Sequence, residues 1–246
     1  MSKYGSSHNL RSQLVEYGWL LGLVLAIGST LAWGTVAEPF SIEPVAPHAS
    51  KYLPQSIVDV LEPQGSRLFT YTNGLKMSVC EIFWAKTVVG QDGASTSNKI
   101  SYRNLKPGAL LGVIHFLEEA SEDYREDFHD QKLGPGYYTM RYAVLSDSDT
   151  QDFVMLSPVR LDRALEPVAV GELVRRSRMA SHSKQPAVMS LVPVAVIGNE
   201  FPDIKTDGEG TWTLQIKLHV KPATGSARDL GLAIVVVTPK KAEEGS

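Results

Sequence analysis

The chain has 246 residues, and its 24 lysine and arginine residues against 27 aspartate and glutamate residues give a net charge of −3. This balance provides no overall attraction to nucleic acid. Cys80 is the only cysteine, which excludes an intramolecular disulfide and a Cys-x-x-Cys-His haem attachment. Hydrophobic residues make up 43% of the chain, as is usual for a globular protein, so a packed core has to provide the stability.

An uncharged run from Tyr17 to Ala37 predicts where the rest of the chain is located. As a helix it is about 30 Å long, which matches the hydrocarbon core of a bilayer. It is interpreted either as a signal peptide cleaved after Ala37 or as a retained transmembrane anchor. The anchor is favoured because the run is longer than the roughly 7 to 15 apolar residues of a signal peptide. Trp19 and Trp33 also lie near its ends, as interfacial aromatic residues do.

Small residues recur at every fourth position of this run and would form one face of a helix, against which a second helix can pack. These residues are Gly18, Gly22, Ala26, Thr30 and Gly34. Lys3 and Arg11 precede the run, so the positive-inside rule places residues 1–16 in the cytoplasm. The same rule predicts a single-pass membrane protein with residues 38–246 on the periplasmic or extracellular side.

Residues 38–66 contain five prolines and are predicted to form an extended linker. Within them, the spacing of Ile57, Val58 and Leu61 predicts one short helix. The segment is interpreted equally as a stalk that holds a domain off the membrane or lies along a partner, and as an unstructured connection.

Residues 67–238 are predicted to form one mainly β domain, an antiparallel sandwich of about eight or nine strands with one short helix. Asn73-Gly74 predicts a hairpin turn, and the alternation from Trp212 to Val220 predicts a half-buried strand. Residues 239–246 are a charged tail. Further strands are expected at residues 75–89, 99–103, 109–117, 137–145, 153–156, 187–197 and 230–237.

The ten residues from Leu133 to Tyr142, which begin Leu-Gly-Pro-Gly-Tyr-Tyr, resemble the turn into a late strand of immunoglobulin-like and fibronectin type III-like domains. This resemblance implies an immunoglobulin-like sandwich in which Tyr138 is the tyrosine of a tyrosine corner, its hydroxyl bonding back to the turn. The sequence departs from the family in lacking its paired cysteines and in a short Pro-to-Tyr spacing. The rest of the chain resembles exported bacterial domains, and neither resemblance implies an activity.

A helix is predicted from Pro167 to about Ser181, with a basic C-terminal half. Its arginines Arg175, Arg176 and Arg178 suit the negative end of the helix dipole, and they are also the candidate docking site for an acidic partner. The segment from Glu118 to Asp130 is the acidic counterpart, interpreted as a solvated surface or as a docking site for a basic protein.

Asp147, Asp149 and Asp152 are the candidate metal ligands, because Ca²⁺ takes several carboxylate oxygens. The segment lacks the glycine and the terminal glutamate of an EF-hand loop, and aspartate also suits ordinary turns. The second explanation is favoured, so no cofactor is assigned.

No catalytic site is predicted. His115 shares a strand face with apolar residues, so a hydrogen-bonded core histidine is favoured over a ligand or a base. Cys80 is expected to be a buried, inert thiol. The sequence contains neither a Gly-x-Ser-x-Gly elbow nor a glycine-rich phosphate loop.

These observations predict a non-catalytic accessory or assembly subunit of a membrane protein complex, for instance an energy-converting complex. Its partners would be the membrane and the other subunits, with neither nucleic acid nor a small-molecule substrate indicated. The alternative is a cleaved, secreted module that binds a glycan, a peptide or Ca²⁺. A hydrolase with a site assembled from scattered residues is the third interpretation.

Overall fold

The computed structural model describes ten parts of the chain: residues 40–46, 52–72, 75–92, 102–120, 125, 131–144, 152–192, 194, 201–206 and 211–237. The chain divides into a unit Met1–Glu38 and a compact unit Pro39–Ser246, and all described residues belong to the second. The predicted helix face with Gly18, Gly22, Ala26, Thr30 and Gly34 therefore lies outside them. Within the described residues, no helix is long and apolar enough to cross a membrane.

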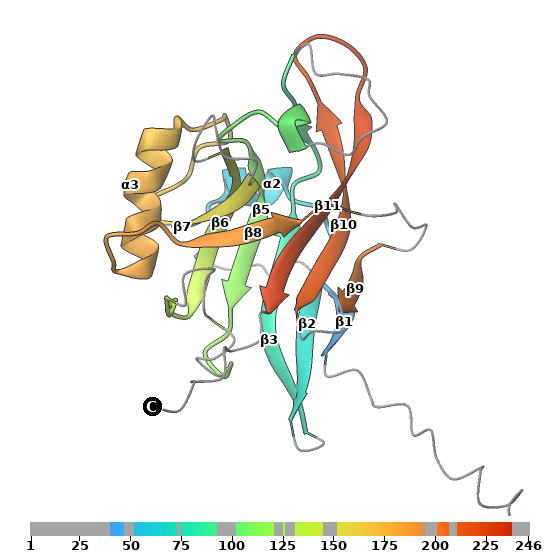
Figure 1. The fold of residues 1–246 in the computed structure, drawn as a ribbon, viewed down its shortest axis with the longest axis vertical. Helices are drawn as coiled ribbons and strands as arrows, with labels where there is room; N and C mark the ends of the chain where they lie inside the picture. Colours follow the sequence, from blue (N-terminus) through green and yellow to red (C-terminus); the bar gives the residue numbers. More distant parts are fainter. Residues whose placement is uncertain are drawn as a thin grey trace, which may run out of the picture. The chain divides into compact units, whose positions relative to one another are not determined.

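The described residues form a mainly β domain with two short α-helices and one 3₁₀ turn (Figure 1). The strands are β1 (Phe40–Val45), β2 (Gly65–Thr72), β3 (Leu75–Trp84), β4 (Val88–Val89), β5 (Leu110–Phe116), β6 (Gly136–Val144), β7 (Asp152–Pro158), β8 (Val188–Val192), β9 (Asp203–Thr206), β10 (Trp212–Lys221) and β11 (Arg228–Val237). The helices are α2 (Gln55–Val60) and α3 (Val170–Ser181), and the 3₁₀ turn is Tyr102–Asn104.

The strands follow one hydrogen-bonded path, β1-β2-β3-β5-β6-β7-β8-β11-β10-β4, with β9 paired to β10 beside it. All pairs are antiparallel except β4 with β10, where Val88 lies opposite Val220. At the other end of the path, Phe40 of β1 packs on Trp212 of β10, with 5.0 Å between the ring centroids. The sheet is therefore nearly closed.

The antiparallel sandwich predicted from the sequence implies two separate sheets, whereas the strands form one continuous sheet. β8 is hydrogen-bonded along both edges, to β7 through Val188 and Met155 and to β11 through Leu191 and Ile234, so it joins the two halves. Strands β1 to β3 and β5 to β8 also pair in chain order, as a meander. Alternation of apolar and polar residues shows that a strand has one buried face. The same alternation occurs in a sandwich and in one folded sheet, so it does not distinguish them.

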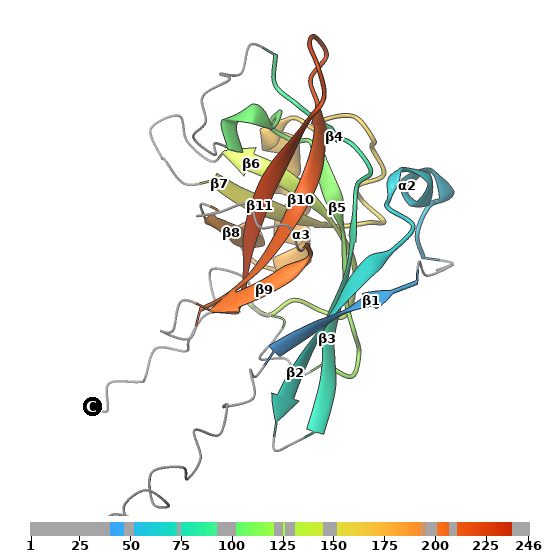
Figure 2. The same ribbon diagram turned by 90° about the vertical axis from the view of Figure 1, so that its right-hand side faces the viewer.

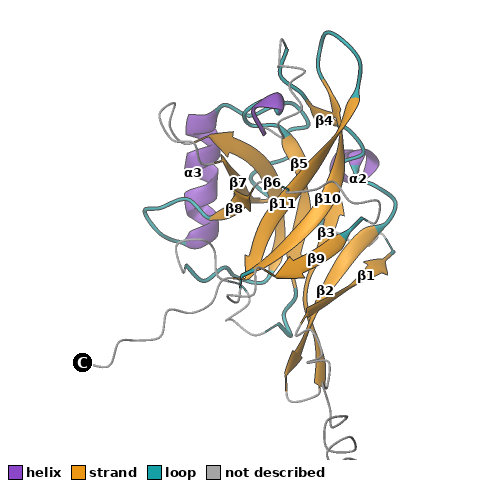
Figure 3. Cartoon of the chain, turned by 45° about the vertical axis from the view of Figure 1, so that its right-hand side comes forward, coloured by secondary structure: helices purple, strands orange, loops and turns teal. Residues whose placement is uncertain are grey.

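The main core fills the space between the half that contains β3, β5, β6 and β7 and the half that contains β10 and β11. Figure 3 shows β10 and β11 in front of β3 and β5. The alternation predicted from Trp212 to Val220 is confirmed, because every second side chain of β10 is buried. Complete burial of a large aliphatic side chain is worth about 1.5 to 3 kcal/mol, so this face contributes strongly to stability.

The predicted linker is partly folded into the domain. β1 pairs with β2 from Phe40 to Val45, and Pro44 is tolerated there because β1 is an edge strand. The predicted short helix is confirmed as α2, which lies outside the sheet (Figure 2). Its fully buried Ile57 packs with Phe83 of β3 and Val113 of β5. Apolar packing attaches this segment to the outer face of the sheet. The number of prolines in a segment gives no information about such packing.

Helix α3 is present as predicted and packs on β7, where Leu173 joins a cluster with Phe153 and Met155. Two strand predictions are corrected. β3 ends at Trp84, because the backbone then bonds to the segment after α2 through Glu62 N and Trp84 O at 2.7 Å. Of the strand expected at residues 99–103, Tyr102 and Arg103 belong instead to the 3₁₀ turn Tyr102–Asn104. Residues 99–101 lie outside the described residues.

Candidate functional site

Four polar and aromatic side chains form a row across neighbouring strands. The register places Arg67 of β2 opposite Glu81 of β3, Glu81 opposite His115 of β5, and His115 opposite Tyr137 of β6. Directly opposite residues in antiparallel strands have Cβ atoms about 5 Å apart, so their side chains can interact. We call Arg67, Glu81, His115 and Tyr137 the cross-strand row.

Glu81 is the centre of this row and is fully buried. Its Oε1 accepts hydrogen bonds from Nε of Arg67 at 2.9 Å and from Nη2 of the same guanidinium, and its Oε2 lies 3.1 Å from Nδ1 of His115. A buried carboxylate is costly unless it is paired, and Arg67 supplies the opposite charge. Glu81 therefore fixes the orientation of the imidazole of His115.

The ring of His115 stacks on that of Tyr137, with 3.9 Å between centroids and 4° between planes. The His115 side chain is 19% exposed. The hydrogen bond predicted for this histidine is confirmed, and its position is at the edge of the core, beside a pocket. Tyr52 continues the aromatic surface, 6.5 Å from Tyr137 between ring centroids.

The pocket has a volume of about 520 Å³, within the range of small-ligand sites. Its walls come from β5, the turn before β6, the loop after β7 and the C-terminal end of α3. The aromatic side combines His115, Tyr137 and Tyr52, and the exposed Met179 adds apolar surface. Charged and titratable groups complete the lining: Glu118, Arg160 and His182.

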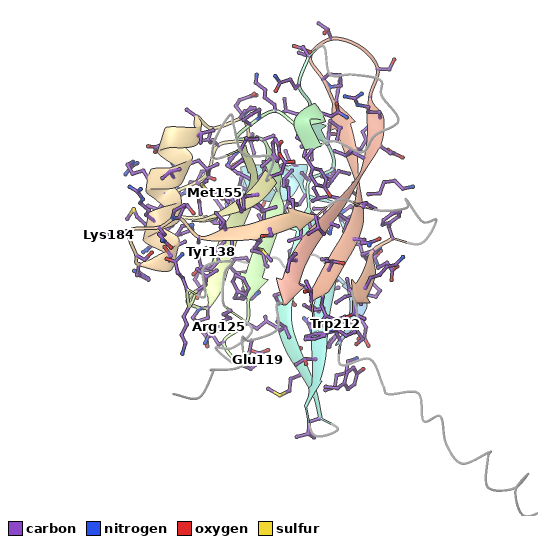
Figure 4. The ribbon with its side chains drawn as sticks, viewed as in Figure 1. Glu119, Arg125, Tyr138, Met155, Lys184 and Trp212 are labelled. Carbon is purple, nitrogen blue, oxygen red and sulfur yellow. The ribbon has the colours of Figure 1, made fainter. Side chains whose placement is uncertain are left out.

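Tyr138 lines the same pocket, and its hydroxyl donates a hydrogen bond to the carbonyl of Gly134 at 2.8 Å. This is the kind of bond back to the turn that the resemblance to immunoglobulin-like domains implies for Tyr138. Burial raises the pKa of the Tyr138 hydroxyl, and the positive charges of Arg125 and Arg160 oppose this rise. Tyr138 and Arg125 lie in the half of the domain that carries α3 (Figure 4). The pocket therefore has two cations near its phenol.

A buried ion cluster of Thr139, Arg141, Asp162 and Arg176 supports these walls. Arg141 and Asp162 are both fully buried and form a bidentate pair, Nε to Oδ2 at 2.5 Å and Nη2 to Oδ1 at 2.9 Å. Thr139 Oγ1 donates to Asp162 Oδ2 at 2.7 Å, and Arg176 Nη1 donates to Oδ1 at 3.0 Å. Charge-assisted bidentate bonds are among the strongest in proteins.

The same cluster holds backbone segments in place. Arg141 donates to the carbonyls of Gly108 at 2.7 Å and Ala164 at 2.5 Å. Arg176 lies on α3, so Asp162 connects the loop after β7 to both β6 and α3. That loop provides Arg160 to the pocket, and the end of α3 provides Met179 and His182. Both walls are therefore fixed to the sheet by bonds within the protein.

The arginines predicted to dock a partner occupy different environments. Arg176 is 20% exposed and pairs with Asp162 and Glu172, so it holds α3 to the sheet. Arg175 pairs with Glu172 on the surface of α3, and Arg178 is exposed. Hydrogen bonds from Arg175 and Arg176 lower the pKa of Glu172 to about 2. Docking through Arg175 and Arg178 remains a prediction.

Of the candidate calcium ligands, Asp147 and Asp149 lie outside the described residues. Asp152 Oδ1 accepts a hydrogen bond from the Tyr142 hydroxyl at 2.6 Å. Among the residues that the structure describes, no group of three potential ligands could hold a metal ion.

Cys80 is a buried thiol, as predicted, and burial raises its pKa to about 12. Sequence reasoning missed Glu81 and Tyr137 as partners of His115, and Arg67 as the partner of Glu81. Residues 67 and 81 lie on opposite sides of the predicted Asn73-Gly74 turn, which suggests that they meet. The pairing of β3 with β5 has no such local signal.

Comparisons of the chain with models of protein families, with characterised proteins and with solved structures give no match.

Proposed function

We propose that residues 40–237 form a non-catalytic binding domain on the outer side of a membrane and that the pocket beside the cross-strand row binds a glycan. The observation that carries this proposal is the aromatic side of the pocket, where Tyr52 and the stacked pair His115–Tyr137 adjoin charged groups. A sugar ring has apolar C–H faces that can cover aromatic rings and hydroxyls that hydrogen-bond to carboxylate, guanidinium and imidazole groups.

The geometry supports recognition more than reaction. The buried ion cluster and Glu81 hold the pocket walls in one arrangement, which reduces the entropy lost when a ligand binds. The described lining contains no serine, threonine or cysteine beside His115 that could act as a nucleophile. Glu118 is the single carboxylate of the described lining, whereas glycoside hydrolysis ordinarily uses a pair of carboxylates, so the pocket suits binding of a glycan better than its cleavage.

The location on the outer side of a membrane rests on the sequence. The uncharged run 17–37 would anchor the chain, and Lys3 and Arg11 before it would keep residues 1–16 in the cytoplasm. In that arrangement the domain faces the space where surface and cell-wall glycans occur.

Binding is tested with the full-length protein in lipid nanodiscs, screened against a panel of neutral and acidic oligosaccharides and followed by calorimetry. We expect His115→Ala and Tyr137→Leu to weaken binding of the best ligand at least tenfold, because each removes one ring of the stacked pair. His219→Ala is the matched control, since His219 is an exposed histidine on β10 outside the pocket. Unchanged affinity in both pocket variants, or the absence of any bound glycan, would reject the proposal.

An assembly subunit of a membrane complex is the second candidate, supported by the four-residue spacing of small residues in the run 17–37. Purification in mild detergent would then recover a stoichiometric membrane partner. Gly22→Leu should reduce this recovery, whereas Val24→Leu, half a turn away, should not. Equal recovery with both variants would mean that the spacing reflects composition only.

A further inference from the structure

The β2–β3 hairpin and the beginning of β1 lie at the same end of the sheet. In the register, Phe40 is opposite Thr70, and Thr72 is opposite Leu75. β5 pairs with β3 only from Cys80 to Trp84, so the end of β2 at Thr72 and the beginning of β3 at Leu75 extend beyond β5 (Figure 1). The point where the chain enters the domain is therefore next to a projecting hairpin.

The described side chains at this tip are suited to a boundary between water and lipid. Leu75 is 69% exposed and Tyr71 is 39% exposed, although both are large and hydrophobic, and the register places them on opposite faces of the hairpin. The Tyr71 hydroxyl accepts a hydrogen bond from Ser41 at 3.3 Å. Lys76 lies over the ring of Phe69, 4.0 Å from its centroid, and pairs with Glu43. Tyrosine favours the interface of a bilayer, and a lysine can keep its ammonium in water while its alkyl chain covers apolar surface.

Chain length limits how far this tip can be from a membrane. Only Glu38 and Pro39 separate the predicted anchor, which ends at Ala37, from Phe40, so Phe40 is within about 11 Å of the end of the anchor. β1 runs from Phe40 to Val45, and the antiparallel β2 runs back until Thr70 lies beside Phe40. Tyr71 and Thr72 continue β2 beyond Thr70, the partner of Phe40, by about 7 Å, a distance comparable to the thickness of the headgroup layer.

We propose that the β2–β3 hairpin contacts the lipid bilayer and inserts Leu75 and Tyr71 into its interfacial layer. This inference rests on the membrane location in the proposed function. The contact gives the domain a second attachment beside the anchor and thereby limits its rotation. Lipid is the occupant of this proposal because only two residues separate the predicted anchor from Phe40, which lies at the same end of the sheet as Tyr71 and Leu75.

The test uses the full-length protein in phosphatidylcholine nanodiscs, with a nitroxide label introduced by Leu75→Cys. Native Cys80 is buried with a pKa of about 12, so labelling selects the new cysteine, and the labelled wild-type chain measures the background. Leu165→Cys is the matched control, because Leu165 is a 40% exposed leucine in the loop after β7. We expect the ratio of collisions with oxygen to collisions with a nickel chelate to be at least threefold higher at residue 75 than at residue 165.

Equal, water-like ratios at the two positions in a protein that remains in the nanodisc would overturn the hairpin contact and leave the membrane location intact. Loss of the protein from the nanodisc would overturn both. A second variant, Tyr71→Ser, should lower the ratio at residue 75 with little effect on thermal stability, because the Tyr71 side chain lies on the surface and its hydrogen bond with Ser41 is solvent-exposed. An unchanged ratio would count against insertion of Tyr71.

Discussion

The buried ion cluster and the cross-strand row both join an arginine to a carboxylate across neighbouring strands, but they differ in access to solvent. In the buried ion cluster, Arg141 and Asp162 are both fully buried, and Arg141 also bonds to backbone carbonyls. In the cross-strand row, only Glu81 is fully buried, while the Arg67 side chain is 33% exposed and that of His115 is 19% exposed.

This difference assigns the two groups to different tasks. The Arg141–Asp162 pair at the centre of the buried ion cluster is fully enclosed and is stable only because both charges are paired, so it leaves no group for a ligand. In the cross-strand row, the enclosed carboxylate of Glu81 holds the imidazole of His115 at the wall of the pocket. We conclude that the first group sets the positions of the walls and that the second presents a fixed aromatic surface.

Removal of the central charge of the enclosed group should have the largest effect. Asp162→Asn leaves the guanidinium of Arg141 buried without a counter-ion, and we expect it to lower the free energy of unfolding by about 3 to 5 kcal/mol. Urea denaturation measures this loss. Asp229→Asn, which changes an exposed carboxylate, should stay within about 0.5 kcal/mol of the wild type. A loss below about 1 kcal/mol for Asp162→Asn would contradict the structural role given to the buried ion cluster.

A backbone change at the same cluster should come next. Gly108 has φ +82°, its carbonyl accepts from Arg141, and a Cβ added there would lie 1.9 Å from the carbonyl oxygen of Val168. Gly108→Ala should therefore cost about 1 to 3 kcal/mol, measured by the same denaturation. Gly171→Ala in α3 is the opposite case, since nothing lies within 4 Å, and a gain of up to about 1 kcal/mol is expected. If Gly108→Ala and Gly171→Ala lost similar amounts of stability, the close contact at residue 108 would not be the cause of the loss.

In the cross-strand row, Glu81→Gln should cost less than Asp162→Asn, about 1 to 2 kcal/mol, because water can reach the exposed side of Arg67. It should also weaken ligand binding, because the imidazole of His115 loses the carboxylate that orients it. Denaturation and calorimetry on one sample separate the two effects. If Glu81→Gln destabilises as much as Asp162→Asn and leaves binding unchanged, the row is structural only.

The smallest effect concerns pH and Glu172, at the solvent edge of the buried ion cluster. Its folded-state pKa of about 2 lies below the usual value of about 4.3, so its stabilisation is present above that usual value and is lost as the pH falls toward 2. The melting temperatures of the wild type and Glu172→Gln should therefore differ at pH 6 and converge near pH 2. A constant difference over this range would contradict the pKa shift. High salt should reduce the difference, because the pair is exposed.

The part of the fold predicted from the sequence is the part set by local periodicity. The alternation of β10, the helical spacing at Ile57, the segment that forms α3 and the burial of Cys80 depend on residues within a few positions of each other. The uncharged run 17–37 is another such local pattern, and the membrane location that it predicts is a proposal of the same origin.

Tertiary structure alone decided the closure of the sheet and the composition of the site. The pairing of β8 with both β7 and β11, and the positions of Glu81 opposite His115 and of Asp162 beside Arg141, join residues that lie far apart in the chain. A strand presents the same alternation whichever neighbour it pairs with, so register and strand order leave no local pattern in the sequence. They follow from the packing of whole faces, which is why the pocket became visible only in the folded domain.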